Sequence, residues 1–220
     1  MGAILAHSVK HAGGMFKKGR VLSAEDVSAI KEAGTPKVFA ARLGPDDVPE
    51  DEAAAAIAEV AGGGGTSAQA PFTGRANLHS SVHGLALVDM ARVRALNRLH
   101  ESLTLATAAH HAVVEKRQMV ATVKIIPFAV PRDILAQALT IIGNEPVIRV
   151  EAFRHRLAGL VITRLPQTKP TLIAKSEAAM RERIAALDGE LGPVIVCDHA
   201  IAPVREAILK LKAQHCHPIL

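Results

Sequence analysis

The sequence predicts an α/β protein in two parts: a mixed α+β unit over residues 1–145, and the first part of a parallel α/β domain over residues 146–220. Before residue 145, capped amphipathic helices are mixed with short β-branched segments. After residue 145, apolar strands and amphipathic helices alternate regularly, which is typical of parallel sheets with helical crossovers. The apolar content of 49% is enough for a core, and 220 residues fit one large or two modest domains.

Residues 2–43 carry clear local signals. An apolar segment starts at Ile4 and ends in the Gly13-Gly14 turn. Ser23 can cap a helix, and Asp26 three residues later gives a weak form of the capping box. Gly34 supplies a left-handed stop, after which residues 37–43 read as a strand.

An alanine-rich helix is predicted over residues 49–61, with Pro49 near its first position and three carboxylates in its first turn. The four glycines at residues 62–65 end this helix. With Thr66 and Ser67 they predict a helix stop and a loose connection. A phosphate-binding P-loop is disfavoured, because its glycines lead into a helix, whereas these glycines lead away from one.

The other elements of the first part follow from β-branched content, caps and prolines. Strands are expected at 85–88, 104–107, 112–115 and 119–126, and a helix at 90–99 with Asp89 as its cap. Pro127 and Pro131 bracket a turn, and Pro131 opens a helix that Gly143 closes.

The second part reads as strands at 147–150, 157–163 and 193–197, helices at about 172–187 and 202–214, and a further strand beginning at Ile219. Doubly wound sheets generally need about five strands or more. We therefore expect residues 146–220 to be a truncated part of a larger domain.

Composition limits the functions that fit. The net charge of +5 and the isoelectric point near 9.5 suit an anionic ligand, a nucleic acid or an acidic protein surface. The chain has no Trp, no Tyr and five Phe, whereas single-strand binders stack bases on aromatic side chains, so nucleic acid is disfavoured. No signal peptide or membrane span is recognisable, which predicts a cytoplasmic protein. Cys197 and Cys216 are expected to be reduced thiols.

No metal site is expected. His215 and His217 could place two imidazoles on one face of a strand, but the pattern offers no third ligand.

The first candidate binding site follows the strand at 157–163. Parallel strands bind ligands at their carboxyl ends, and helix N-termini attract anions. The cations and hydroxyls expected there are Thr163, Arg164, Lys169, Thr171 and Lys175. An ordinary solvated loop explains them equally well. Asp198 follows the next parallel strand, where it is either a site residue or a cap for the next helix.

The second candidate site combines Thr73, Arg75 and Asn77 with Lys124. Lysine inside the apolar run VATVKIIPFAV is costly to bury alone, so it must face solvent, a carboxylate or a ligand pocket. Arg75 beside Gly74 can present a bidentate fork to phosphate or carboxylate. The alternative is an edge strand with Lys124 facing outward.

Three segments carry a resemblance to a known family: GAILAHSVKHAGGMFKKGRVL with the following helix, the FTGRANL segment at residues 72–78, and LAT at 105–107 with MVATVKIIPFAV at 119–130. Together they resemble bacterial molybdopterin-binding proteins, which are related to the molybdopterin molybdotransferases and adenylyltransferases. Some relatives are joined to a molybdenum-cofactor cytidylyltransferase domain. The resemblance implies a protein of molybdenum cofactor biosynthesis and identifies residues 146–220 as part of a molybdopterin-binding domain.

The ligand implied by this resemblance is molybdopterin or its nucleotide-activated form, with Mg²⁺ accompanying a nucleotide. A catalytic member would be a transferase that assists molybdate insertion or nucleotide transfer. The sequence identifies no catalytic residues and leaves open whether catalysis occurs. Another molybdenum-cofactor enzyme is an expected partner, and a homo-oligomer is compatible with the sequence. The alternative is a non-catalytic basic α/β protein that binds nucleic acid or an acidic protein partner.

Overall fold

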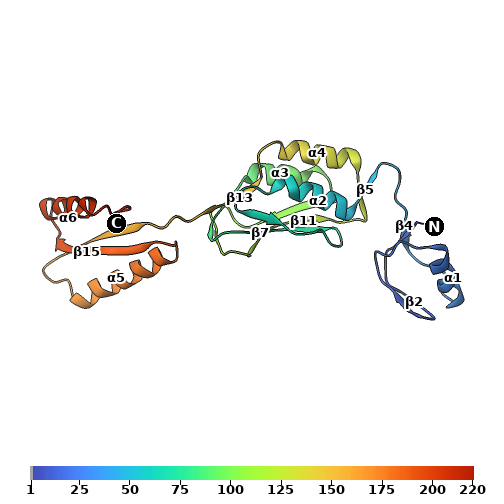
Figure 1. Ribbon diagram of the computed structural model, residues 1–220, viewed down its shortest axis with the longest axis horizontal. Helices are drawn as coiled ribbons and strands as arrows, with labels where there is room; N and C mark the ends of the chain where they lie inside the picture. The colour runs from blue at the N-terminus through green and yellow to red at the C-terminus, as the bar shows by residue number, and fades with distance from the viewer. Residues whose placement is uncertain (1) are drawn as a thin grey trace. The chain divides into compact units, whose positions relative to one another are not determined.

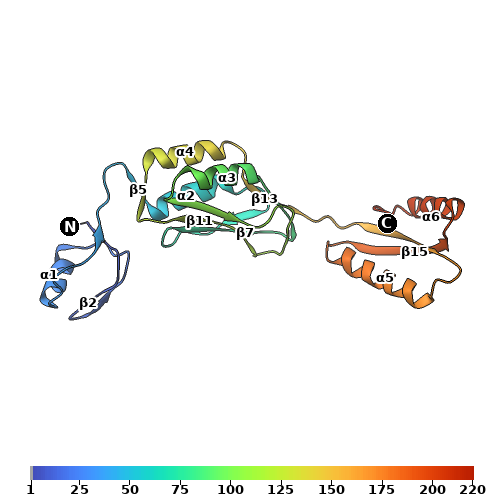
Figure 2. The same cartoon turned by 180° about the vertical axis from the view of Figure 1, so that it is seen from behind.

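The computed structural model describes residues 2–220 and has the mixed α/β fold predicted from the sequence. The chain forms two compact units (Figures 1 and 2): unit 1 ends at Glu151, and unit 2 spans Ala152–Leu220. The sequence places the boundary near residue 145. In the structure the division comes at the end of β13 (Ile148–Ala152), since β13 is hydrogen-bonded to β8 (Gly84–Val88) of unit 1.

The first segment of unit 1 is held by a small core of Leu5, Phe16, Leu22 and Ile30. Its elements are β1 (Ile4–Leu5), β2 (Val9–His11), β3 (Gly14–Phe16), α1 (Ala24–Glu32) and β4 (Ala40–Ala41). The strand expected over residues 37–43 is reduced to the two residues of β4, which pair with β1.

The start of α1 forms the capping box that the sequence predicts. The Asp26 N–H donates to the Ser23 hydroxyl, and the Ser23 N–H donates to the Asp26 carboxylate. Arg20 adds two hydrogen bonds of 2.9 Å to the same carboxylate. The hydrogen bonds from Arg20, and after them the one from the Ser23 N–H, lower the pKa of the Asp26 carboxyl.

The central part of unit 1 is a four-stranded antiparallel sheet with helices on one face (Figure 1). In spatial order its strands are β6 (Thr66–Ala68), β7 (Arg75–Ser80), β11 (Met119–Ile125) and β9 (Leu103–Thr107). The helices are α2 (Glu50–Ala61), α3 (Met90–Leu99) and α4 (Arg132–Ile142). Helix α2 packs on β7 and β11, because its alanines and Ile57 form a closely fitting apolar face.

Two smaller sheets complete unit 1. Strand β8 lies between β10 (Val113–Val114) and β13, and β5 (Asp47–Pro49) pairs with β12 (Ala129–Pro131). The turn expected between Pro127 and Pro131 is shorter than predicted, since the bend covers residues 126–128. Residues 129–131 form a strand, because they find a partner far away in the sequence.

The four glycines end α2 as predicted, but the loose connection expected there is wrong. The Gly63 N–H donates to the Ile148 carbonyl, and the Gly64 carbonyl accepts from the Val150 N–H. The glycines therefore run closely against β13. Gly65 has a φ of +72° and lies so near the Val150 carbonyl that a side chain would not fit.

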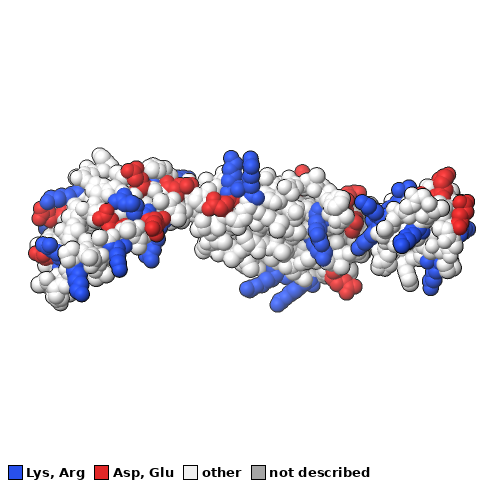
Figure 3. Space-filling model, turned by 90° about the horizontal axis from the view of Figure 1, so that it is seen from below, with Lys and Arg blue, Asp and Glu red and all other residues white. Residues whose placement is uncertain are grey.

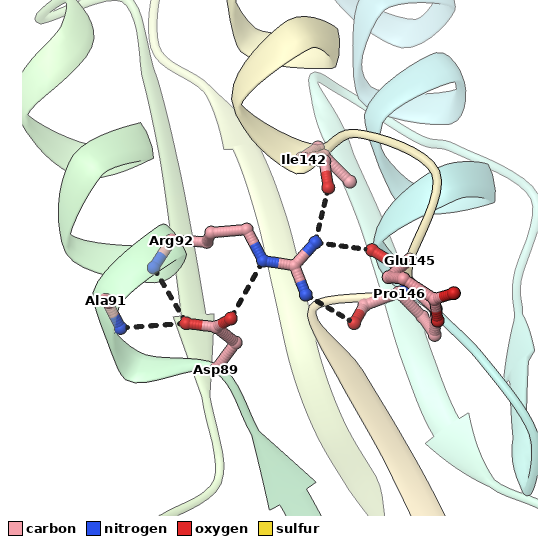
Figure 4. A network of polar contacts seen from close by, with 6 residues as sticks. All are labelled: Asp89, Ala91, Arg92, Ile142, Glu145 and Pro146. Carbon is pink, nitrogen blue, oxygen red and sulfur yellow. Dashed lines mark hydrogen bonds and ion pairs between the residues drawn. The ribbon is translucent and has the colours of Figure 1, made fainter.

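Arg92 of α3 joins three parts of unit 1 (Figure 4). Its guanidinium donates to the Asp89 carboxylate and to the carbonyls of Ile142, Glu145 and Pro146. Asp89 is at the same time the N-cap of α3. The arginine thus fixes the end of α4 and the segment before β13 to the start of α3.

Unit 2 is built on two parallel strands, β14 (Leu157–Arg164) and β15 (Glu190–Asp198), with α5 (Pro170–Ala185) between them in the sequence. Helices α5 and α6 (Ile201–Ala213) cover opposite faces of this ribbon, as both views show (Figures 1 and 2). After α6, residues 218–220 run beside β14, with a parallel bridge between Gly159 and Ile219. Ala158, Leu160 and Leu191 form the core.

Within residues 2–220, the helices are too short or too polar to span a membrane.

Candidate functional site

The carboxyl ends of β14 and β15 bring three of the predicted residues together. Thr163 is paired with Cys197, and Arg164 is paired with Asp198 in the parallel register. The parallel pairing fixes this neighbourhood, because the last residues of both strands must lie at one edge.

Side-chain contacts link the two strand ends. Arg164 Nε lies 3.4 Å from Asp198 Oδ1, and His199 Nδ1 lies 3.0 Å from the Thr163 hydroxyl oxygen. The side chains of Arg164 and Asp198 are 58% and 75% exposed, so their ion pair contributes little to stability. The contact uses Arg164 Nε, and the two terminal nitrogens of the guanidinium face no protein acceptor within the described residues.

A pocket of about 540 Å³ opens at this edge. Its lining consists of Arg164, Leu165, Pro166, Thr168, Asp198 and His199. The loop that forms one wall is closed by a bond from the Leu165 N–H to the Thr168 hydroxyl and by one from the Thr168 N–H to the Leu165 carbonyl. The sequence alone does not single out His199 or Thr168. Their position, directly after a strand or within the loop that follows one, is the signal that could have identified them.

The predicted residues of α5 and its N-cap are not in the lining of this pocket. Lys169 is the N-cap residue of α5, while Thr171 and Lys175 are exposed on its first two turns. Neither α5 nor α6 has a side-chain N-cap. At α5, Pro170 has no N–H and the Leu172 N–H donates to the Lys169 carbonyl, which leaves the Thr171 N–H for an anion.

The second predicted set meets at a pocket of unit 1. Thr73, Arg75 and Lys124 line a cavity of about 380 Å³. Arg75 and Lys124 are direct partners in the β7–β11 register, which places two cations side by side. Lys18, Glu50 and Phe128 also line the cavity, and none of these three is evident from the sequence, because they come from separate segments.

A tight turn holds Arg75 in place. Thr73 and Gly74 both have positive φ, of +49° and +71°, and connect Phe72 to Arg75 through paired backbone hydrogen bonds. The Gly74 N–H donates to the Asp51 carboxylate at 2.7 Å, and the Gly74 carbonyl accepts from the Ile125 N–H. A Cβ at Gly74 would lie 2.8 Å from Glu50 Oε2, so the absence of a side chain lets the Glu50 carboxylate lie against the turn.

Glu50 is the carboxylate of this cavity. Burial raises its pKa, and the neighbouring Asp51 carboxylate raises it further, while Lys18 opposes both effects. Asn77 does not reach the cavity. Its side-chain oxygen instead accepts a hydrogen bond of 2.9 Å from the Thr122 hydroxyl on β11.

The histidines form no metal-binding cluster within residues 2–220, where no group of three His, Cys, Asp or Glu side chains converges. The rings of His110 and His111 lie with their centroids 3.6 Å apart and are tilted by 38°, and His110 Nδ1 accepts from the Val88 N–H. His215 has a φ of +58°, so the segment 215–217 is not the strand that would place two imidazoles on one face.

Comparison with known protein families finds a match at the start of the chain. The family described as a domain of unknown function, DUF8806, matches residues 1–42, a stretch that includes α1, the strands β1–β4 and Lys18 of the unit 1 cavity. No curated protein and no solved structure matches the chain.

Proposed function

We propose that the protein binds molybdopterin or its nucleotide-activated form at the carboxyl edge of β14 and β15, in molybdenum cofactor biosynthesis. The topology of unit 2 is the observation that carries the site. Strand β14 lies between β15 and residues 218–220, and α5 and α6 cover opposite faces. In sheets of this kind, ligands bind at the carboxyl end of the strand whose two neighbours are reached by crossovers on opposite faces. In unit 2 this strand is β14, and its carboxyl end is Arg164.

The residues of this edge suit a phosphate. Arg164 can keep Nε on Asp198 while its terminal nitrogens form a bidentate contact with phosphate oxygens. Asp198 then orients the guanidinium. Thr163, the residue before Arg164, and His199, the residue after Asp198, add a hydroxyl and an imidazole that contact each other. The nature of the ligand beyond its phosphate rests on the resemblance of residues 2–43, 72–78 and 119–130 to molybdopterin-binding proteins.

The described residues offer few oxygen ligands for Mg²⁺ at this edge. Asp198 is the carboxylate that lines the pocket, and it is already paired with Arg164. Since Mg²⁺ prefers several oxygen ligands, a nucleotide would have to supply most of them through its own phosphates. Participation in molybdate insertion or nucleotide transfer would require groups in addition to those of this pocket.

The alternative of a basic nucleic-acid-binding protein has weaker support. On the face shown in Figure 3, Lys and Arg side chains of unit 2 are interspersed with Asp and Glu side chains and form no continuous basic stripe. Chains that bind nucleic acid without reading sequence usually present such a stripe. Of the five Phe in the chain, Phe39 and Phe72 are well exposed, and two rings offer little surface on which bases could stack.

The test is a titration of molybdopterin, or of a stable pterin phosphate, with wild type and Arg164→Ala at two salt concentrations. Loss of one charge-assisted contact should weaken binding about ten- to a hundredfold. Arg183→Ala is the matched control, because Arg183 is an exposed arginine in the last turn of α5. Equal affinities for wild type and Arg164→Ala would contradict the assignment. Tight binding of duplex DNA with steep salt dependence, and no binding of the pterin, would favour the alternative.

A further inference from the structure

We infer that the unit 1 cavity binds the oxyanion of a small phosphate ester through Arg75, Lys124 and Thr73, and that Glu50 takes up a proton from the solvent when the anion binds. The residues of this site differ from those at the carboxyl edge of unit 2. The two proposals therefore stand or fall separately.

The first support is the pairing of like charges. Arg75 and Lys124 are direct cross-strand partners, and such pairs of equal sign destabilise a sheet. Both side chains are exposed, and neither forms an ion pair or a side-chain hydrogen bond among the described residues. An anion held between them would remove the repulsion, and the Thr73 hydroxyl at the same cavity can donate to it.

The second support is the position of Glu50. Its carboxylate lies against Gly74 and forms no hydrogen bond or ion pair among the described residues, although three cations line the same cavity. The charged or titratable groups facing it are Lys18, Asp51, Arg75 and Lys124. An ionised Glu50 would repel a bound oxyanion, whereas a protonated Glu50 could donate a hydrogen bond to it.

The apolar side of the cavity indicates what the oxyanion is attached to. Phe128 and Ile126 line it, and Ile126 is 54% exposed. The Lys18 ammonium lies 5.6 Å from the centre of the Phe128 ring, so the ring is part of the same charged surface. A volume of about 380 Å³ exceeds the needs of a bare anion. We therefore expect a phosphate ester with a flat apolar group.

Linkage makes the proton uptake measurable. If the anion prefers the protonated form of Glu50, its affinity rises as the pH falls through the pKa of that carboxyl, and binding in turn raises this pKa. Sulfate is a suitable probe, because it does not titrate in the range where the protein is studied. Measurements in an Arg164→Ala background remove the contribution of unit 2.

The experiment is a calorimetric titration of sulfate between about pH 8 and about pH 5. In the Arg164→Ala background, affinity should rise as the pH falls, whereas the further substitution Glu50→Gln should bind more tightly at the upper pH and lose the dependence. Lys124→Gln should weaken binding about tenfold or more, and Lys116→Gln, an exposed lysine outside the cavity, should not. Phenyl phosphate should bind more tightly than methyl phosphate.

Two outcomes would overturn the inference. Unchanged sulfate affinity in Lys124→Gln would show that the cation pair does not bind the anion. A pH dependence retained in Glu50→Gln would show that another group takes up the proton. Circular dichroism of each variant establishes that it is folded, and since Lys124 is exposed, its substitution tests the site without disturbing the core.

Discussion

Gly65 is a position at which the fold does not accommodate a side chain. Its φ of +72° disfavours a side chain, and a Cβ would overlap the Val150 backbone carbonyl. We expect Gly65→Ala to lower the free energy of unfolding by about 2–4 kcal/mol, because strain and overpacking add. The adjacent Gly64 meets nothing within 4 Å, so Gly64→Ala should change stability by less than about 0.5 kcal/mol. Urea unfolding measures both, and equal effects would contradict the close approach to β13.

Asp26 gives unit 1 a defined response to acid. Hydrogen bonds from Arg20 and from the Ser23 N–H lower the pKa of its carboxyl in the folded state. Its contribution to stability is therefore fully present above the unfolded pKa, near 4, and is lost as the pH falls through the folded pKa.

We expect wild type to lose more stability than Asp26→Asn between about pH 6 and about pH 3. Thermal unfolding followed at both pH values measures the difference. Glu32→Gln at the other end of α1 is the control, and it should behave like wild type. An identical acid response of wild type and Asp26→Asn would show that the capping box and the Arg20 contact do not act through ionisation of Asp26.

Among the secondary-structure elements, α3, the end of α4 and the segment before β13 are held together by the side chain of Arg92. One planar guanidinium reaches the Asp89 carboxylate and three carbonyls (Figure 4), a geometry that a lysine ammonium cannot reproduce. Arg92→Lys should cost about 1.5–3 kcal/mol. Arg94→Lys on the exposed side of α3 is the matched control and should be nearly neutral. Chemical unfolding of the two variants, which have the same charge, decides whether the guanidinium geometry matters.

The elements also show what the sequence can predict. The ends of α1, α3 and α4 follow from Ser23, Asp89 and Gly143, because capping depends on residues within one turn. The pairing of β5 with β12 does not follow, since the two strands are distant in the sequence and too short to carry a periodic pattern.

The two candidate sites also differ in how much of each could be predicted from the sequence. Arg164 and Asp198 could be placed together from the sequence, because parallel strands share their carboxyl edge. The pairing of Arg75 with Lys124 required the antiparallel register, which a shift by one residue would change. Glu50 could not be connected with either cation, since its approach depends on Gly74 having no side chain.

For the whole molecule, the division into two units predicts where a protease acts first. Residues 153–156 connect β13 to β14 without regular structure, and Arg154 in this segment is exposed. The backbone carbonyl of the nearby Arg156 accepts from the Glu190 N–H, which ties that residue to unit 2. We therefore expect brief trypsin treatment to cut after Arg154 before it cuts elsewhere, because local opening of this segment disrupts no helix or strand. One contact that must open with it is that between His155 Nδ1 and the Asp188 carbonyl oxygen. Mass spectrometry should identify one fragment that ends at Arg154 and one that begins at His155.

Arg154→Gln should slow this first cut, while Arg183→Gln within α5 should not. A first cut inside α2 or α5 would mean that a helix opens more readily than the connection between the units.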